Sequence, residues 1–217
     1  MSEVKQVSLV ATPLSPLASR TVMTLPKSLA PRSRRALAAL AVAFGAAACE
    51  DPFQLQASNP NADASFEIWA MSGAPAAYPS GLLVAQASVV RLDAAGSFDL
   101  AFDIDADGRL MVWPVTSVVS PIAGSRAIAF QRATGVYNAL LEAPKTGWTN
   151  DTLLLVNEGQ AFFAKVTTLY CQYDLRQDIY AKFYVDSVIP AERRIRLSAR
   201  VNPNCGFRSL VLGVPEF

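Results

Sequence analysis

Length, composition and charge exclude several classes of protein. The chain has 217 residues and no histidine, so it has no imidazole for a catalytic triad, a cysteine–histidine dyad or a metal site. Residues 1–48 carry a net charge of +5, whereas residues 49–217 carry thirteen basic and seventeen acidic side chains, a net charge of −4. Nucleic-acid binding depends on neutralising phosphates, so we expect no nucleic-acid partner for the acidic part.

The region before Cys49 has the layout of a secretory signal peptide. Arg32, Arg34 and Arg35 form a positive cluster, residues 36–48 form an apolar run without charge, and three alanines stand directly before the cysteine. The order of charged, apolar and small residues is typical of export signals, and the run is shorter than the ~20 residues that span a bilayer. We expect residues 1–48 to be a signal peptide with an N-terminal signal helix. Its start is either Met1 or Met23.

The sequence Ala-Ala-Ala-Cys at 46–49 resembles the lipobox of bacterial lipoproteins, although Ala46 stands where that family prefers leucine. The resemblance implies that Cys49 receives a lipid anchor that includes palmitate and becomes the mature N-terminus. It also implies attachment to the cell membrane or the outer membrane, with the rest of the chain facing the periplasm or the exterior. Residues 49–65 are then the lipidated cysteine and a flexible tether. An ordinary signal peptide with a nearby chance cysteine is the alternative.

Residues 66–217 are predicted to form a single all-β domain. In residues 97–105, apolar and mostly acidic side chains alternate with period two, which favours a strand with one buried and one solvated face. The turn sequence at 105–108 and the apolar residues that follow complete a hairpin. Many short strands between turn residues indicate an antiparallel β-sandwich or barrel of about 9–11 strands. Further strands are expected at 66–70, 82–92, 127–132, 136–141, 153–156, 160–169 and 207–212.

A second hairpin is predicted at 181–201. Its first strand places Ala181, Phe183 and Val185 on one face, and its second strand places Ile195, Leu197, Ala199 and Val201 on one face. Packing these faces together fixes the parity of the register, since a slip of one residue would expose every apolar side chain. Two-residue shifts remain open.

Two cysteines remain after Cys49 is assigned to the lipid. Cys171 precedes the second hairpin and Cys205 follows it. An even pair in an oxidising compartment predicts a disulfide that closes the open end of the hairpin. Two buried free thiols are the alternative. The stretch Asn-Pro-Asn-Cys-Gly at 202–206 is interpreted as a structural turn.

Carboxylates supply the candidates for chemistry. Asp103, Asp105 and Asp107 have the alternate spacing of a calcium loop, and Gly108 permits a sharp turn. Pro114 stands where a calcium loop needs a bidentate glutamate, so an acidic hairpin turn is the favoured interpretation, and no metal or cofactor is predicted. Asp99, Asp103 and Asp105 could also serve a glycoside hydrolase, but acids on a solvated face are common. No catalytic residue is assigned.

Two further groups of side chains bear on binding. Arg194, Arg196 and Arg200 form a basic stripe that is expected to pair with acids across the strand, with Asp186 as the partner. The alternative is contact with an anionic lipid or polysaccharide. The tryptophans are expected in the core, with sugar stacking as the alternative. They are Trp69, Trp113 and Trp148.

The predicted function is that of a membrane-anchored envelope lipoprotein with a non-catalytic binding or structural β domain. Its partners are the membrane, through the N-terminal lipid, and either a glycan or another envelope protein. A glycan- or calcium-binding surface module is the first alternative, and a carboxylate-based glycoside hydrolase is a remote one. The mature part resembles uncharacterised envelope lipoproteins, a resemblance that implies no specific activity.

Overall fold

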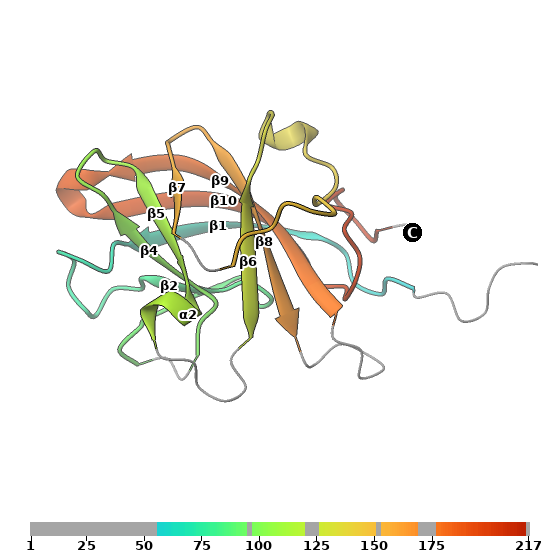
Figure 1. Ribbon diagram of the computed structural model, residues 1–217, viewed down its shortest axis with the longest axis horizontal. Coiled ribbons are helices and arrows are strands. Elements are labelled where there is room, and N and C mark those ends of the chain that lie inside the picture. The colour runs from blue at the N-terminus through green and yellow to red at the C-terminus, as the bar shows by residue number, and fades with distance from the viewer. Residues whose placement is uncertain (1–55, 95–96, 120–125, 151–152, 169–176, 216–217) are drawn as a thin grey trace, which may run out of the picture. The chain divides into compact units, whose positions relative to one another are not determined.

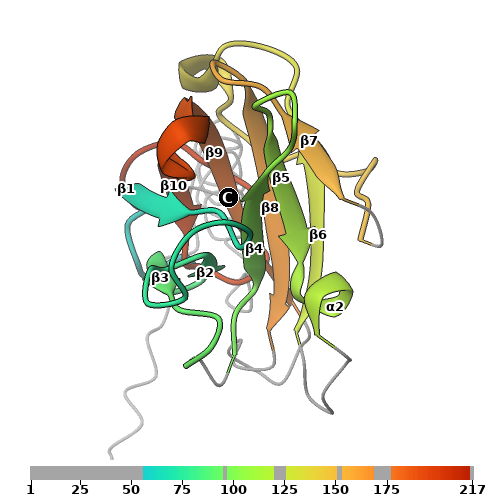
Figure 2. The ribbon, with the colours of Figure 1, turned by 90° about the vertical axis from the view of Figure 1, so that its left-hand side faces the viewer.

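The computed structural model describes residues 56–94, 97–119, 126–150, 153–168 and 177–215. Residues 55–217 form one compact unit. Within the described residues the chain forms ten strands in two five-stranded antiparallel sheets and one short α-helix, α2 (Val115–Val118). The helix follows β5 directly and lies at the lower end of the view in Figures 1 and 2.

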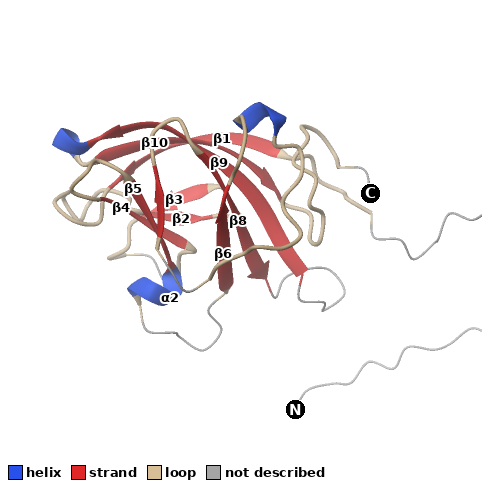
Figure 3. Ribbon diagram, turned by 45° about the horizontal axis from the view of Figure 1, so that its top comes forward, coloured by secondary structure: helices blue, strands red, loops and turns tan. Residues whose placement is uncertain are grey.

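The first sheet has the order β1-β10-β9-β8-β6. Every neighbouring pair in it is antiparallel. Its longest strand is the central β9, and Figure 3 shows β9 crossing the domain beside β10 and β8. The strands are β1 (Ala62–Trp69), β6 (Ala127–Arg132), β8 (Ala161–Thr168), β9 (Gln177–Ile189) and β10 (Arg194–Asn202).

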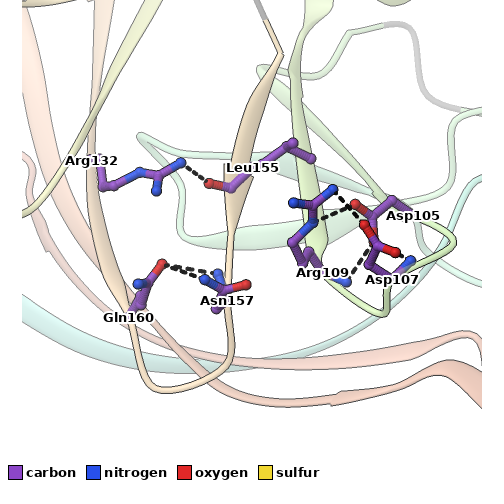
Figure 4. A network of polar contacts seen from close by, with 7 residues as sticks. All are labelled: Asp105, Asp107, Arg109, Arg132, Leu155, Asn157 and Gln160. Carbon is purple, nitrogen blue, oxygen red and sulfur yellow. Dashed lines mark hydrogen bonds and ion pairs between the residues drawn. The ribbon is translucent and has the colours of Figure 1, made fainter.

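The second sheet has the order β3-β2-β4-β5-β7 and is made of shorter strands, again all antiparallel. Arg132 at the end of β6 donates a hydrogen bond to the carbonyl oxygen of Leu155 in β7 at 2.5 Å, which links the edges of the two sheets (Figure 4). The strands are β2 (Gly81–Leu83), β3 (Ser88–Val90), β4 (Leu100–Ile104), β5 (Leu110–Pro114) and β7 (Leu154–Val156).

One hydrophobic core lies between the two sheets. The core includes Phe66 of β1, Phe162 of β8 and Phe183 of β9 from the first sheet and Phe102 of β4 from the second. The rings of Phe162 and Phe183 stack with their centroids 4.9 Å apart. Burial of these faces is the main favourable term in folding, and it requires both sheets. The predicted all-β antiparallel fold is therefore confirmed, in its sandwich form: within the described residues the two sheets share no ladder that would close a barrel.

The predicted hairpin at 181–201 is confirmed in both its faces and the parity of its register. Ala199 lies opposite Phe183 and Val201 lies opposite Ala181. A bulge shifts the register between Arg196 and Leu197, which the alternation of apolar residues does not indicate. A 3₁₀ turn, η3 (Pro190–Glu192), joins the strands, and Arg193 ends it in the left-handed region with φ 52°.

The predicted solvated face of β4 is wrong. Asp99 is fully buried before the strand begins, and Ala101 and Asp103 within it are buried as well. Their face is covered because Arg126 contacts Asp99, and Ser72 and Arg193 contact Asp103. An aspartate can be buried in this way only when donors satisfy its oxygens.

Three expected strands differ from the structure. Residues 82–92 form two strands, β2 and β3, separated by a turn in which Ala87 has φ 47°. Residues 136–141 hold a 3₁₀ turn, η1 (Tyr137–Ala139), in which the backbone N–H groups of Ala139 and Leu140 donate to the carbonyl oxygens of Val136 and Tyr137. Residues 207–212 form no strand, since their carbonyl groups accept hydrogen bonds from asparagine side chains.

The domain begins before the expected boundary at residue 66. β1 starts at Ala62, and the backbone N–H groups of Ser58 and Asn59 already donate to the side chain of Asn204 at 3.0 Å. The C-terminal end of the predicted tether therefore belongs to the folded domain. Residues 49–55 lie outside the described residues.

Candidate functional site

In the candidate calcium loop, Asp105 and Asp107 form hydrogen bonds and ion pairs within the turn itself. Asp105 accepts hydrogen bonds from the backbone N–H groups of Asp107 at 3.0 Å and Arg109 at 2.8 Å, and from Arg109 Nε at 2.7 Å (Figure 4). Arg109 also pairs with Asp107 at 2.9 Å. These bonds, led by the one from the Arg109 backbone, lower the pKa of Asp105. A cation at this turn would have to compete with a resident guanidinium.

The third aspartate of that motif faces other partners. Asp103 accepts hydrogen bonds from Ser72 Oγ at 2.6 Å and from Arg193 Nη2 at 2.5 Å. Within the described part of the chain, no three cysteine, aspartate or glutamate side chains gather where they could hold a metal ion. The motif residues are thus close in sequence, but the fold divides them between two arginines.

Asp99, the first member of the carboxylate set, lies in a third environment. Its carboxylate accepts hydrogen bonds from the backbone N–H of Val84 and from Arg126 Nε, both at 2.7 Å. Burial raises the pKa of Asp99, although the charge of Arg126 opposes the shift. A glycosidase needs two carboxylates that face one substrate across a few ångströms. Here Asp99 and Asp103 each face a separate arginine from another part of the chain.

The basic stripe on β10 pairs with acids, as predicted, but the partner differs. Arg194 contacts Glu67 at 2.5 Å, and Arg200 binds Asp63 through two nitrogens at 2.6 and 2.9 Å. Both acids belong to β1, the strand that pairs with β10. Asp63 lies directly opposite Arg200, whereas Glu67 lies opposite Arg196, on the same face as Arg194. The expected partner Asp186 instead accepts a hydrogen bond from Ser198 at 2.8 Å.

Arg196 is the exception in the stripe. Its side chain is exposed, and it forms no ion pair with any residue that the structure describes. It lies directly opposite Glu67, whose carboxylate is already held by Arg194. The hydrogen bond from Arg194 is also the main cause of the lowered pKa of Glu67. Arg196 therefore keeps its donors for solvent or for a ligand.

An aromatic pair stands next to these charges. Trp69 at the end of β1 stacks on Tyr78 with ring centroids 4.7 Å apart, and Tyr78 is 44% exposed. Trp69 lies opposite Arg194 in the ladder, on the side of β1 that also carries Glu67. An exposed aromatic face beside an arginine and a carboxylate offers stacking and directed hydrogen bonds to one ligand. We name Glu67, Trp69, Tyr78, Arg194 and Arg196 the aromatic–arginine site.

The other two tryptophans have structural environments. Trp113 of β5 packs against the main core, as predicted. Trp148 packs with Phe163 and Leu210 in a smaller cluster on the outer side of the first sheet, and its Nε1 donates to the carbonyl oxygen of Pro144 at 3.1 Å.

Lys182 is a buried cation that sequence reasoning missed. It lies on the outer face of β9, fully inaccessible to solvent, with Nζ 4.3 Å from the ring centre of Tyr137. Nζ donates to the carbonyl oxygens of Tyr137 at 3.0 Å and Leu140 at 2.9 Å, so it holds η1 against the sheet. Burial lowers the pKa of Lys182. Alternation alone predicts a solvated lysine here, because the covering residues Tyr137 and Leu140 come from 45 and 42 positions earlier in the chain.

A network of three buried asparagines was also not predicted from the sequence. Asn202 Nδ2 donates to the carbonyl oxygens of Phe207 and Ser209 at 2.9 and 2.8 Å, and its Oδ1 accepts from Asn204. Asn61 Nδ2 donates to Ser209 and Val211 at 2.9 and 2.7 Å. The network joins the start of the domain to its C-terminal segment. The only sequence signal was the unusual Asn-Pro-Asn-Cys-Gly stretch.

The predicted lipid and disulfide positions are only partly within the described residues. Cys49 and Cys171 lie outside them. Cys205 is half-buried beside the main core, and the next residue, Gly206, donates its backbone N–H to the carbonyl oxygen of Asp178 at 3.0 Å. The turn that carries Cys205 thus lies beside the first residues of β9. The pairing of Cys171 with Cys205 remains a prediction.

Comparisons of this chain with protein-family models, curated proteins and solved structures found no match. In the part of the chain that the structure describes, none of the helices has the length and apolar character needed to cross a membrane.

Proposed function

We propose that the protein is an envelope lipoprotein, anchored through Cys49, whose β domain is a non-catalytic binding or structural module. The observation that carries the proposal is the charged cluster and apolar run that end at Ala-Ala-Ala-Cys. The contacts of Asp99, Asp103 and Asp105 support the proposal that the domain is non-catalytic. Each of these carboxylates is bound by an arginine of the domain itself.

The anchor is tested in a bacterial host that processes lipoproteins. Wild-type protein should partition into the detergent phase of Triton X-114, and globomycin, which blocks the lipoprotein signal peptidase, should cause its precursor to accumulate. Cys49→Ala should be neither lipidated nor cleaved by that peptidase, whereas Ala46→Leu, which restores the preferred lipobox residue, should be processed normally. Mature wild-type protein in the aqueous phase would refute the anchor.

A second candidate function, glycan binding, rests on the aromatic–arginine site. The exposed face of Tyr78 can stack against the C–H face of a sugar, while Arg196 and Glu67 can bond its hydroxyl groups. A glycan array on the mature protein tests this function. Binding should be lost in Tyr78→Ala and retained in Val119→Ala, a change at another exposed apolar position. An array without any specific signal would refute glycan binding and favour the structural role of the domain.

A disulfide between Cys171 and Cys205 belongs to the same proposal, since export would place both thiols in an oxidising compartment. Its support is the bond from Gly206 to Asp178, which holds the Cys205 turn beside the start of β9. Cys171 precedes that strand by six residues.

A further inference from the structure

Exposed apolar side chains gather in two segments of the domain. Seven large hydrophobic residues are exposed among the described residues, and five of them come from residues 136–141 and 211–214. Singly scattered exposed hydrophobic residues are normal, whereas a group of them marks an interaction surface. We name this group the apolar end patch: Val136, Leu141, Val211, Leu212 and Val214.

The two segments are adjacent in space. The backbone N–H of Leu210 donates to the carbonyl oxygen of Leu141 at 2.7 Å, and an antiparallel bridge joins Glu142 to Ser209. Figures 1 and 3 show the loop between β6 and β7, the C-terminal segment and the start of β1 at the same end of the domain. The two segments that carry the patch are therefore held side by side where Leu141 and Glu142 meet Ser209 and Leu210.

The backbone beneath the patch is fixed. Asn61 binds the carbonyl oxygens of Ser209 and Val211 through its side chain, and its own N–H donates to Gly213 at 2.8 Å. Leu210 is fully buried on the inner side of the same segment. The fold thus holds this segment in a set position and directs its apolar side chains outward, which costs the free protein favourable burial.

We propose that the apolar end patch rests on the surface of the lipid bilayer. This inference depends on the proposed anchor at Cys49. Asn61, which binds the patch segment, is only twelve residues after Cys49, so the lipid lies at most about 40 Å from it along the chain. A tether of that length keeps this end of the domain near the membrane. Burial of apolar side chains in the interfacial region then adds to the hold of the lipid.

The charges beside the patch suit this placement. Glu142 is paired with Arg208, and Asp63 with Arg200, so neither carboxylate would approach the bilayer as an isolated charge. Arginine side chains can also extend their charged ends to the headgroups while their stems lie on apolar surface.

The test uses lipidated, full-length mature protein in phosphatidylcholine–phosphatidylglycerol vesicles whose headgroup region carries a nitroxide quencher. Leu212→Trp places a tryptophan in the patch, at a position that is 62% exposed, and Val214→Trp repeats the test at a second position. Val119→Trp changes the exposed residue that directly follows α2, and Figures 1 and 3 show α2 away from the C-terminal segment. This variant controls for the attraction of any tryptophan to lipid. Wild-type emission is subtracted from each.

Contact at an interfacial depth of ~5–10 Å should reduce the added emission of Leu212→Trp by about twofold or more, and leave that of Val119→Trp unchanged. Unquenched emission from both patch variants, on protein that floats with the vesicles, would overturn the membrane contact while the anchor stands. Quenching on protein that Triton X-114 leaves in the aqueous phase would support the contact and refute the anchor. Unquenched emission together with a dimer in solution would assign the patch to a second copy of the chain and overturn the proposal.

Discussion

Arg193 Nη2 lies 2.5 Å from Asp103 Oδ1, a contact that joins the turn between β9 and β10 in one sheet to β4 in the other. The same guanidinium donates to the carbonyl oxygens of Ser72 at 2.8 Å and Ile104 at 3.1 Å. Arg193 itself has φ 52°, a conformation that costs a side-chain-bearing residue free energy. The turn therefore places Arg193 at a backbone cost and gains a charged contact between the sheets.

Replacing Arg193 should separate these two effects. Arg193→Ala removes a hydrogen-bonded charge partner of a buried carboxylate and should lower the free energy of unfolding by about 2–3 kcal/mol. Arg193→Gly loses the same contacts but relieves the left-handed backbone, so it should cost less than the alanine change. Urea unfolding measures both, and the exposed Arg196→Ala serves as the control with little effect. Equal stability of Arg193→Ala and wild type would show that the contact contributes nothing.

Asn202 should be the most sensitive position in the asparagine network. Asn202→Asp replaces a donor to the carbonyl oxygens of Phe207 and Ser209 with a buried negative oxygen. The loss should be at least about 3 kcal/mol, because a buried charge then faces two acceptors. Urea unfolding gives the magnitude, and faster cleavage by trypsin after Arg208 would show that the C-terminal segment is released.

The control for that experiment is Asn138→Asp, which adds the same charge at an exposed position. It should leave both stability and cleavage unchanged. If Asn202→Asp and Asn138→Asp behave alike, the network does not hold the C-terminal segment.

Alkaline unfolding should report on Tyr137. Burial raises the pKa of Tyr137 from 10.0 to about 12, and the charges of Asp63 and Asp186 act in the same direction while Arg200 opposes them. A raised folded-state pKa stabilises the fold fully below pH 10.0, and that contribution is lost as the pH rises to about 12. Tyr137→Phe should therefore lose less stability than wild type across this window. Parallel curves for the two proteins would contradict the prediction.

The calcium hypothesis has a direct test at the 105–108 turn. Asp105→Ala plus Asp107→Ala removes the hydrogen bonds to Arg109 and should lower the melting temperature slightly, by the same amount with and without calcium. The expectation follows from the engagement of both carboxylates by Arg109. A large calcium-dependent rise in the wild-type melting temperature, absent in the double variant, would instead establish a calcium site.

Local pattern predicted much of the fold. The alternation in 181–201 predicted the faces of β9 and β10, and β6 occupies residues 127–132 as expected. The failures share a physical cause. Burial of Asp103 depends on Arg193, which is 90 positions away, and burial of Lys182 depends on the carbonyl oxygen of Tyr137, which is 45 positions away. Periodicity reports the neighbours of a residue in the chain, and such partners leave no periodic signal.

The aromatic–arginine site illustrates the same limit. The sequence identified Trp69 and Arg196 as separate features and paired the arginines with Asp186. Trp69 and the arginines become neighbours through the β1–β10 ladder. This ladder pairs residues 125 to 139 positions apart in the chain, which no local pattern specifies.

The disulfide prediction tests compartment, fold and pairing together. Cys171 and Cys205 should be linked in the exported protein, so peptide mapping without reductant should yield one linked pair and no free thiol. The bond closes a loop of about 35 residues, and reduction should lower the free energy of unfolding by roughly 2–4 kcal/mol. Because Gly206 is bound to Asp178, the first loss of protection from amide exchange should fall on residues 177–185 and 199–206. Cys171→Ser plus Cys205→Ser should reproduce the reduced state, and it should no longer respond to reductant. Free thiols at both positions in protein isolated from the envelope would refute the bond and remove the covalent part of the hold on the β9–β10 hairpin.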